Sequence, residues 1–257
     1  MRKIVTALAL VIIVLPSPIV MAHDVAKDKK ANAPHPSPWD GTNAQVGYVV
    51  NRGNTNSSMM NLGLNLSYKK PRWQNQFQAQ FQYGKQDHTA NRQYTHLNDQ
   101  VQWSLNDHKK LDNFIFTNGD SIITKFGPYS YQNVFAAGWG KRWVDTKHFT
   151  LSAQVGPGYR VTKVQDESDV ESSFIGTVQS NISLILSSYG TLTQSIRFDL
   201  AKPYNYVQAV TAFTNKIVGH IAVQVSYTLT YYSQIPTSSA NTKKMDTITN
   251  ISLVYNF

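Results

Sequence analysis

The sequence predicts an all-β chain that closes into a transmembrane, antiparallel, up-and-down β-barrel of about twelve strands, with both ends of the mature chain on the periplasmic side. Three observations support this prediction. Apolar side chains alternate with polar ones through most of residues 41–257. The polar rows are mostly uncharged, and the amino terminus reads as an export signal with no later apolar run long enough for a membrane helix.

The alternation is clearest in residues 73–83. One parity carries Trp73, Phe77, Ala79, Phe81 and Tyr83, and the other carries Gln74, Gln76, Gln78, Gln80 and Gln82. Successive side chains of a strand point to opposite faces, whereas a helix would scatter the glutamines around its axis. A soluble sheet usually turns charge towards water. A face of uncharged amides therefore suits a wall between lipid and a hydrated lumen.

Residues 1–22 have the pattern of a secretory signal peptide. Arg2 and Lys3 precede an apolar stretch over residues 4–14, and small residues before His23 form a cleavage pattern. A membrane helix is the alternative, but prolines at 16 and 18 interrupt a run that is shorter than the roughly 20 residues needed. Residues 23–40, rich in lysine and proline, predict an extended periplasmic tail before the barrel at 41–257.

The remaining strands follow as apolar rows predicted to face lipid. In chain order these rows are Ala44, Val46, Tyr48, Val50; Met60, Leu62, Leu64, Leu66, Tyr68; the Trp73 row; Leu97, Val101, Trp103, Leu105; a weak row at Phe114 and Phe116; Phe135, Ala137, Trp139, Trp143; Phe149, Leu151, Ala153, Val155, Tyr159, Val161; Phe174, Val178, Ile182, Leu184, Leu186; Leu192, Ile196, Phe198, Leu200; Ile221, Val223, Val225, Tyr227, Leu229, Tyr231; and Met245, Ile251, Leu253, Tyr255, Phe257. The parity is ambiguous between residues 206 and 214, and Asp99 is a fault on an apolar row.

The connections are an independent indication of a membrane barrel. Those near Lys70, Asp107, Asp145, Ser188 and Lys216 are predicted to be short, and those near Asn54, Asp87, Lys125, Glu167, Pro203 and Ser238 mostly longer. This alternation is typical of outer-membrane barrels, which have short periplasmic turns, long external loops and an even strand number.

A soluble periplasmic barrel or sandwich is the alternative fold, because it shares the period of two. The polar rows are too small and polar to make a dry core, and aromatics gather towards strand ends as in an interfacial girdle. The chain also ends on an aromatic residue, Phe257. We therefore expect a bacterial outer-membrane location. The expected partners are membrane lipids, lipopolysaccharide and, through the strand that ends at Phe257, the barrel-assembly machinery.

Composition argues against several other classes. The chain has no cysteine, so neither a disulfide nor a thiolate metal site can form. The net charge of +9 is spread along the chain rather than concentrated among stacking aromatics, which argues against nucleic-acid binding.

Several segments resemble the salt-induced outer-membrane protein family, whose members are largely uncharacterised. They are residues 52–56 running into 61–68, Tyr83-Gly84-Lys85, residues 151–160 and residues 244–257. The resemblance covers about residues 45–257, with departures at Arg52 and in 112–131. It implies an outer-membrane barrel, and the family's name suggests an osmotic response, but it supplies no ligand or catalytic residue.

No enzyme, metal or cofactor site is predicted. His96 and His220 are the histidines expected in the lumen, and neither lies in a recognisable motif with a serine nucleophile and a carboxylate. The acidic residues in 166–169 could hold calcium or bridge cations to lipopolysaccharide, but their spacing is not that of a regular site. No glycine-rich phosphate loop opens a helix, so no nucleotide cofactor is expected.

The predicted lumen carries the functional hypotheses. The candidate lumen-lining residues are Gln76, Gln78, Gln80, Arg160, Arg197 and Asp199. Such charges can select solutes, or they can pair across the interior and close it. The leading hypothesis is a narrow, porin-like channel for small polar solutes, or a stress-responsive envelope protein. The alternatives are a structural or surface-interaction barrel with a plugged lumen and, as a third, a lipid-modifying enzyme.

Overall fold

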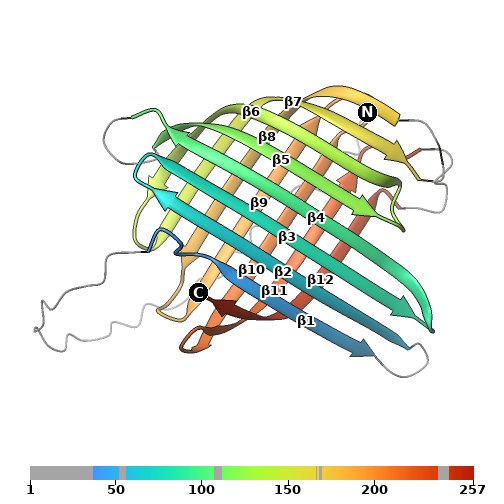
Figure 1. Ribbon diagram of the computed structural model, residues 1–257, viewed down its shortest axis with the longest axis horizontal. Coiled ribbons are helices and arrows are strands. Elements are labelled where there is room, and N and C mark those ends of the chain that lie inside the picture. The colour runs from blue at the N-terminus through green and yellow to red at the C-terminus, as the bar shows by residue number, and fades with distance from the viewer. Residues whose placement is uncertain (1–36, 52–55, 107–111, 166, 168–169, 237–242) are drawn as a thin grey trace, which may run out of the picture. The chain divides into compact units, whose positions relative to one another are not determined.

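Antiparallel strands follow one another around a closed barrel in the computed structural model (Figure 1). The structure describes residues 37–51, 56–106, 112–165, 167, 170–236 and 243–257. The strands are β1 (Asn43–Asn51), β2 (Ser57–Lys70), β3 (Trp73–Gln86), β4 (Thr89–Ser104), β5 (Asn113–Thr124), β6 (Tyr129–Asp145), β7 (Phe149–Val164), β8 (Val170–Ile185), β9 (Gly190–Leu200), β10 (Tyr206–Val218), β11 (Ile221–Tyr232) and β12 (Met245–Asn256). The predicted fold class, an up-and-down barrel of twelve strands, is confirmed.

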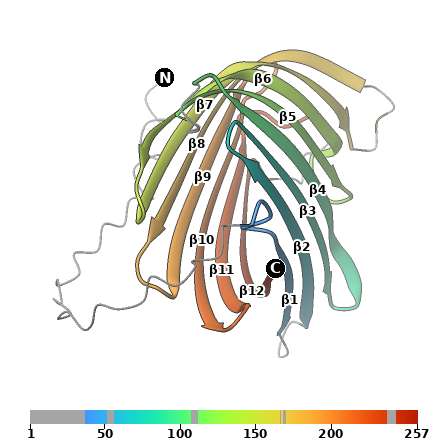
Figure 2. The same ribbon diagram turned by 60° about the vertical axis from the view of Figure 1, so that its left-hand side comes forward.

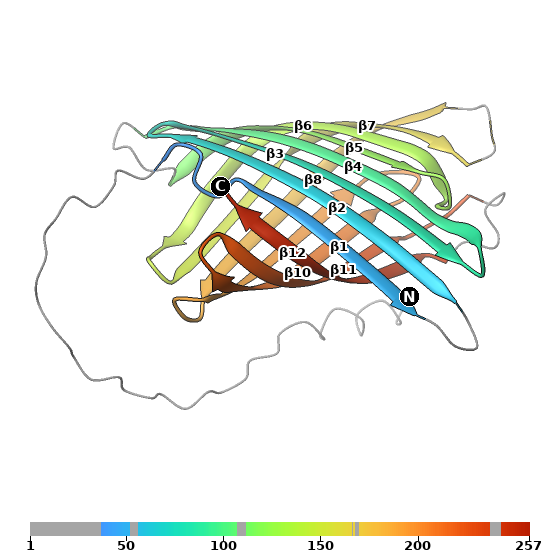
Figure 3. The same ribbon diagram turned by 60° about the horizontal axis from the view of Figure 1, so that its bottom comes forward.

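The barrel closes where β1 pairs with β12 (Figures 2 and 3). The pairing runs from Asn43 opposite Asn256 to Val46 opposite Leu253. On its other edge β1 pairs with β2 over a longer stretch, and Val50 still lies opposite Ser58. Because β1 and β12 are antiparallel, the start of β1 and the end of β12 lie at the same end of the barrel.

Residues just before the predicted barrel boundary at 41 contact the barrel wall. The backbone N–H of Lys69 donates to the carbonyl of Pro38 at 2.7 Å, and the ring of Trp39 lies 4.8 Å from that of Tyr68. Residues 37–40, assigned to the tail from the sequence, thus contact β2. The predicted signal peptide and most of the tail lie outside the described residues. In the part of the chain that the structure describes, no helix is long and apolar enough to cross a bilayer.

The wall is apolar outside and largely polar inside, as the alternation predicts. Phe174 is 84% exposed on the outer face, whereas Arg160 on the neighbouring strand is 1% exposed inside. Outer positions of nearly every strand carry large exposed apolar side chains, and most of the buried polar side chains lie on the inner face. The fault at Asp99 also lies outside, where it accepts a hydrogen bond from Nδ2 of Asn75 at 2.8 Å.

The predicted orientation of β5 is wrong. Phe114 and Phe116 are buried inside the barrel at 1% and 2% exposure, and Ile115 and Ile123 face outward. The reason is non-local, because Phe114 lies opposite Gly140 of β6. A Cβ atom at Gly140 would lie 2.4 Å from the Phe114 ring, so the aromatic side chain fits inside only because Gly140 has none.

The structure also places His220 and fixes the orientation of β10. His220 lies in the exposed turn between β10 and β11 rather than in the lumen. The ambiguous strand β10 turns Tyr206 and Ala212 inward, where both are buried, and Phe213 outward. Its pattern is unclear because small apolar residues occur on both parities.

The predicted alternation of short and long connections fails at two places. Asp87 and His88 form a tight turn between β3 and β4, with φ angles of 47° and 68°. The connection over residues 105–112, predicted to be short, is longer than that turn. Asp and His populate the left-handed region more readily than most residues, so a tight turn forms here without glycine.

Candidate functional site in the barrel lumen

An ion pair crosses the barrel interior. Nη1 of Arg197 on β9 lies 3.1 Å from Oδ1 of Asp120 on β5, and Nη2 lies 2.9 Å from Oδ2 of Asp199. Strands β6, β7 and β8 separate β5 from β9 in the sheet. The Arg197–Asp120 contact therefore spans the lumen instead of joining neighbouring strands.

We call Arg197, Asp120 and Asp199 the charge network. Polar neighbours hydrogen-bond to both of its carboxylates. Nε2 of His96 lies 2.7 Å from Oδ2 of Asp120, and Nδ2 of Asn98 donates to the same oxygen at 2.9 Å. Oγ1 of Thr177 donates to Oδ1 of Asp199 at 2.9 Å. The exposed fractions of Asp199, Asp120 and Arg197 are 0%, 4% and 8%. Buried charges of this kind are stable only when paired and hydrogen-bonded, so the network must form as a unit.

A second bridge consists of neutral amides. Gln100 on β4 and Gln154 on β7 donate to each other's side-chain oxygens at 3.2 and 3.1 Å. Strands β5 and β6 lie between them in the sheet. The inner face of β5 is thus covered, and all of its inward side chains from Phe114 to Ile122 are buried.

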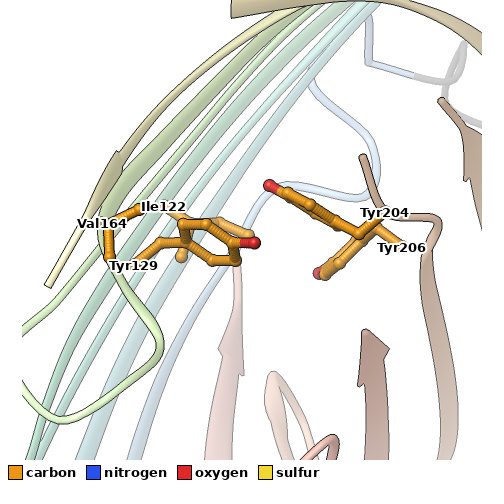
Figure 4. Close-up of a cluster of buried hydrophobic side chains, with 5 residues drawn as sticks. All are labelled: Ile122, Tyr129, Val164, Tyr204 and Tyr206. Carbon is orange, nitrogen blue, oxygen red and sulfur yellow. The ribbon is translucent and has the colours of Figure 1, made fainter. Parts of the chain in front are cut away.

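A cluster of tyrosines narrows one end of the lumen. It consists of Tyr129 on β6, Tyr204 in the connection 201–205, Tyr206 on β10 and Tyr232 on β11. The rings of Tyr129 and Tyr204 stack with their centroids 4.8 Å apart, and the ring of Tyr232 lies 5.7 and 5.8 Å from these two. Figure 4 shows Tyr129 and Tyr204 pointing toward one another from different sides of the lumen. We call these four residues the tyrosine cluster.

Arg160 on β7 anchors the tyrosine cluster. Its guanidinium carbon lies 3.7 Å from the centroid of the Tyr204 ring, and Nη2 donates to the Tyr204 carbonyl at 3.0 Å. The Tyr204 hydroxyl donates to Oε1 of Gln132 at 3.1 Å. Burial raises the pKa of Tyr204 to about 12, so the hydroxyl is protonated and can donate at neutral pH. These contacts hold the connection 201–205 over the lumen.

The wall at β3 is different, because its inner face is accessible to water. Gln78 is exposed although it lies on the inward row, and Gln76 and Gln80 are half-buried. Nε2 of Gln76 donates to Asn65 at 3.3 Å, and Nε2 of Gln80 donates to Asn61 at 3.2 Å. The lumen is thus divided into a packed part against β5 and a hydrated part along β3.

A hollow of about 390 Å³ lies at the end of the barrel where β3 connects to β4. It is lined by Val49, Ser57, Ser58, Met59, Gly84, Lys85, Gln86, Asn91, Arg92 and Thr249. Nη1 of Arg92 lies 3.3 Å from Oδ2 of Asp246 on β12, and its Nε donates to Gln82 at 2.7 Å. Arg92 at this opening therefore has its own carboxylate partner.

The six residues singled out from the sequence fall in three places. Arg197 and Asp199 meet in the charge network, Arg160 packs on Tyr204, and the three glutamines line the hydrated wall. Asp120, Gln132 and Tyr204 were not among them. Asp120 shares a face of β5 with Phe114 and Phe116. Because apolar rows are expected to face lipid, the sequence alone did not place Asp120 in the lumen.

The candidate metal ligands and the lumen histidine considered in the sequence can be placed in part. Within the described residues, no group of three or more His, Asp or Glu side chains is placed to hold a metal ion. In the acidic stretch 166–169, residues 166, 168 and 169 lie outside the described residues. His96, a lumen histidine predicted from the sequence, contacts Asp120 in the charge network.

Comparisons with known proteins give a family, a sequence relative and solved structures that superpose on the chain. A family model described as "Protein of unknown function, DUF481" matches residues 44–257. The chain is 22% identical over 224 residues to the uncharacterized protein YdiY of Escherichia coli strain K12, covering 85% of this chain and 83% of that protein. The solved structure of the NanC porin superposes with a TM-score of 0.52 at 9% identity, over 84% of this chain and 100% of that one. An outer-membrane channel from Pseudomonas putida F1 gives a TM-score of 0.49 at 10% identity, over 90% of this chain and 100% of that one.

Proposed function

The chain belongs to the DUF481 family of proteins of unknown function, and we propose that it is a narrow outer-membrane channel for small polar solutes. The observation that carries the proposal is the accessible amide row on β3. Gln78 is exposed inside a closed barrel, so water occupies the space beside it. The apolar outer face supports placement in a membrane, where only helices and closed barrels satisfy all their backbone hydrogen bonds.

The packed part of the lumen sets the width of this path. A barrel of twelve strands lies between the side-chain-filled barrels of about eight strands and the open channels of about sixteen. The charge network, the Gln100–Gln154 bridge and the tyrosine cluster occupy part of that bore. We therefore expect low conductance and a small size limit for solutes.

The chemistry of the hydrated wall indicates the class of solute. The inward side chains of β3 from Gln74 to Gln82 are amides, which both donate and accept hydrogen bonds. They can replace part of the hydration shell of a polar solute without fixing one charge sign. Small hydroxylated or amide-bearing molecules suit this path.

Planar-bilayer recording of the purified, folded barrel tests the proposal. We expect discrete, low-conductance steps. Gln78→Trp should reduce the step size because the indole occupies the hydrated space, and Phe77→Trp, on the outer face of the same strand, should leave it unchanged. A barrel that is folded and inserted but electrically silent would reject the channel.

A second candidate function rests on a different observation, namely that the Arg197–Asp120 pair crosses the interior. In this alternative the barrel is a structural or surface-interaction protein whose lumen stays closed. It predicts a silent wild-type barrel that conducts only after the tyrosine cluster is removed. The two candidates therefore differ in the same recording.

The remaining parts of the proposal concern the cell. We propose export through residues 1–22, insertion into the outer membrane among lipids and lipopolysaccharide, and delivery to the barrel-assembly machinery through the strand ending at Phe257. An osmotic role is proposed from the family resemblance alone. It predicts that transcript levels rise with external salt, and unchanged levels would remove it.

A further inference from the structure

Two buried hydrogen-bond donors beside Tyr204 have no acceptor. They are Nη1 of Arg160 and Nε2 of Gln132, and within the described residues neither atom has a hydrogen-bond partner. Both side chains are 1% exposed. A buried donor without an acceptor costs about 1–3 kcal/mol, and more when it is charged, so such an atom in a native protein requires an explanation.

The two donors belong to one place in the barrel. Gln132 on β6 lies opposite Thr162 of β7, and Arg160 lies opposite Val134, so Gln132 and Arg160 are diagonal neighbours on the inner face. Diagonal positions of this kind are within reach of long side chains. Both residues also contact Tyr204, Arg160 through the Tyr204 carbonyl and Gln132 through its hydroxyl.

The charge at this place is not neutralised by an ion pair. Arg197 is paired with Asp120 and Asp199, and Arg92 is paired with Asp246. For Arg160, no carboxylate lies within ion-pair distance in the described part of the chain. Glu171 on β8 lies opposite Thr162, diagonal to Arg160, and its side chain is exposed.

We propose that Arg160 and Gln132 form a binding site for a small monovalent anion, which presents one acceptor atom, a halide ion or a carboxylate oxygen, to both donors. Two donors without an acceptor require an acceptor, and the unpaired guanidinium favours one that carries negative charge. The Tyr204 ring lies over the guanidinium, with its centroid 3.7 Å from the guanidinium carbon, and Tyr204 therefore forms one wall of the site. This site goes beyond the channel proposal and does not depend on it, since binding can occur whether or not the barrel conducts.

The test uses chloride as the probe and the width of the chloride NMR line as the readout, measured on the full barrel folded in detergent. Exchange of chloride with a protein site broadens the line. We expect broadening with the wild type, loss of it in Arg160→Gln and reduction in Gln132→Leu. Arg160→Lys should retain part of the broadening because it keeps the charge. Added sodium acetate should narrow the line again if carboxylates share the site.

The matched control is Arg92→Gln, which removes an inward-facing arginine that already has a carboxylate partner. It should broaden the chloride line like the wild type. Each variant is first checked for folding by its heat-dependent mobility on gels. Broadening that persists in folded Arg160→Gln would overturn the proposal. A wild type without broadening would do the same, because the two donors would then bind nothing more than water.

Discussion

The guanidinium of Arg197 on β9 and the carboxylate of Asp120 on β5 join two strands that are four apart in the barrel wall, through one contact of 3.1 Å. In the sheet, β5 pairs with β4 and β6, and β9 pairs with β8 and β10. The side-chain contact therefore adds a crosslink that the backbone hydrogen bonds of the sheet do not provide. The first prediction concerns its contribution to stability.

Asp120→Asn should destabilise the barrel by about 3–5 kcal/mol, because it leaves the buried Arg197 with less compensation. The free energy of unfolding, measured by denaturant titration in lipid vesicles, gives this value. Asp99→Asn on the outer face is the matched control and should change it by under about 1 kcal/mol. Equal effects of the two substitutions would mean that the cross-lumen pair adds nothing.

Tyr204→Ala should widen the end of the lumen that the tyrosine cluster narrows. The stacked contact with Tyr129 and the ring over Arg160 are both lost. Single-channel conductance should rise severalfold over the wild type. Tyr255→Ala, which removes an exposed tyrosine from the outer face, should leave conductance unchanged. The same conductance in both variants would show that the cluster does not limit flow.

Gly140→Ala should destabilise the barrel by about 1–3 kcal/mol, as overpacking does. The new methyl group would lie 2.4 Å from the Phe114 ring. Adding Phe114→Leu should recover part of the loss, which a double-mutant cycle in denaturant measures. Gly176→Ala is the control, because its Cβ would meet no atom within 4 Å. A neutral Gly140→Ala would contradict the inward orientation of β5.

The division of the lumen can be tested with single cysteines, since the chain has none of its own. Gln78→Cys should react quickly with a charged, water-soluble thiol reagent in vesicles. Asn118→Cys, inward on β5 but 6% exposed at the native residue, should react far more slowly. Similar rates at the two positions would contradict the division, because the lumen would then be equally accessible to water along β3 and β5.

Much of the wall could be predicted from sequence because the period of two is a local property. The Arg197–Asp199 pair is local in the same sense, since residues two apart share a face of a strand. The partner of Arg197 across the lumen could not be predicted, because it depends on how the sheet curves and closes. The parity of β5 failed for a similar reason: Phe114 faces inward where a glycine on another strand leaves room for its ring.

The tyrosine cluster shows the same limit. Four tyrosines from three strands and one connection meet, although Tyr129 and Tyr232 are far from the Tyr204–Tyr206 stretch in the sequence. Nothing in the stretch around Tyr204 indicates that its ring turns into the barrel. Its position is explained by non-local contacts with Arg160, Gln132 and the Tyr129 ring.

The short register between β1 and β12 has a mechanical consequence. The join stops at Val46 and Leu253, while the opposite edge of β1 stays bonded to β2 well beyond that point. Fewer main-chain hydrogen bonds hold β1 to β12. We therefore expect this pair to be the last part of the wall to form during insertion. Under lateral tension the cylinder should split along the same line first.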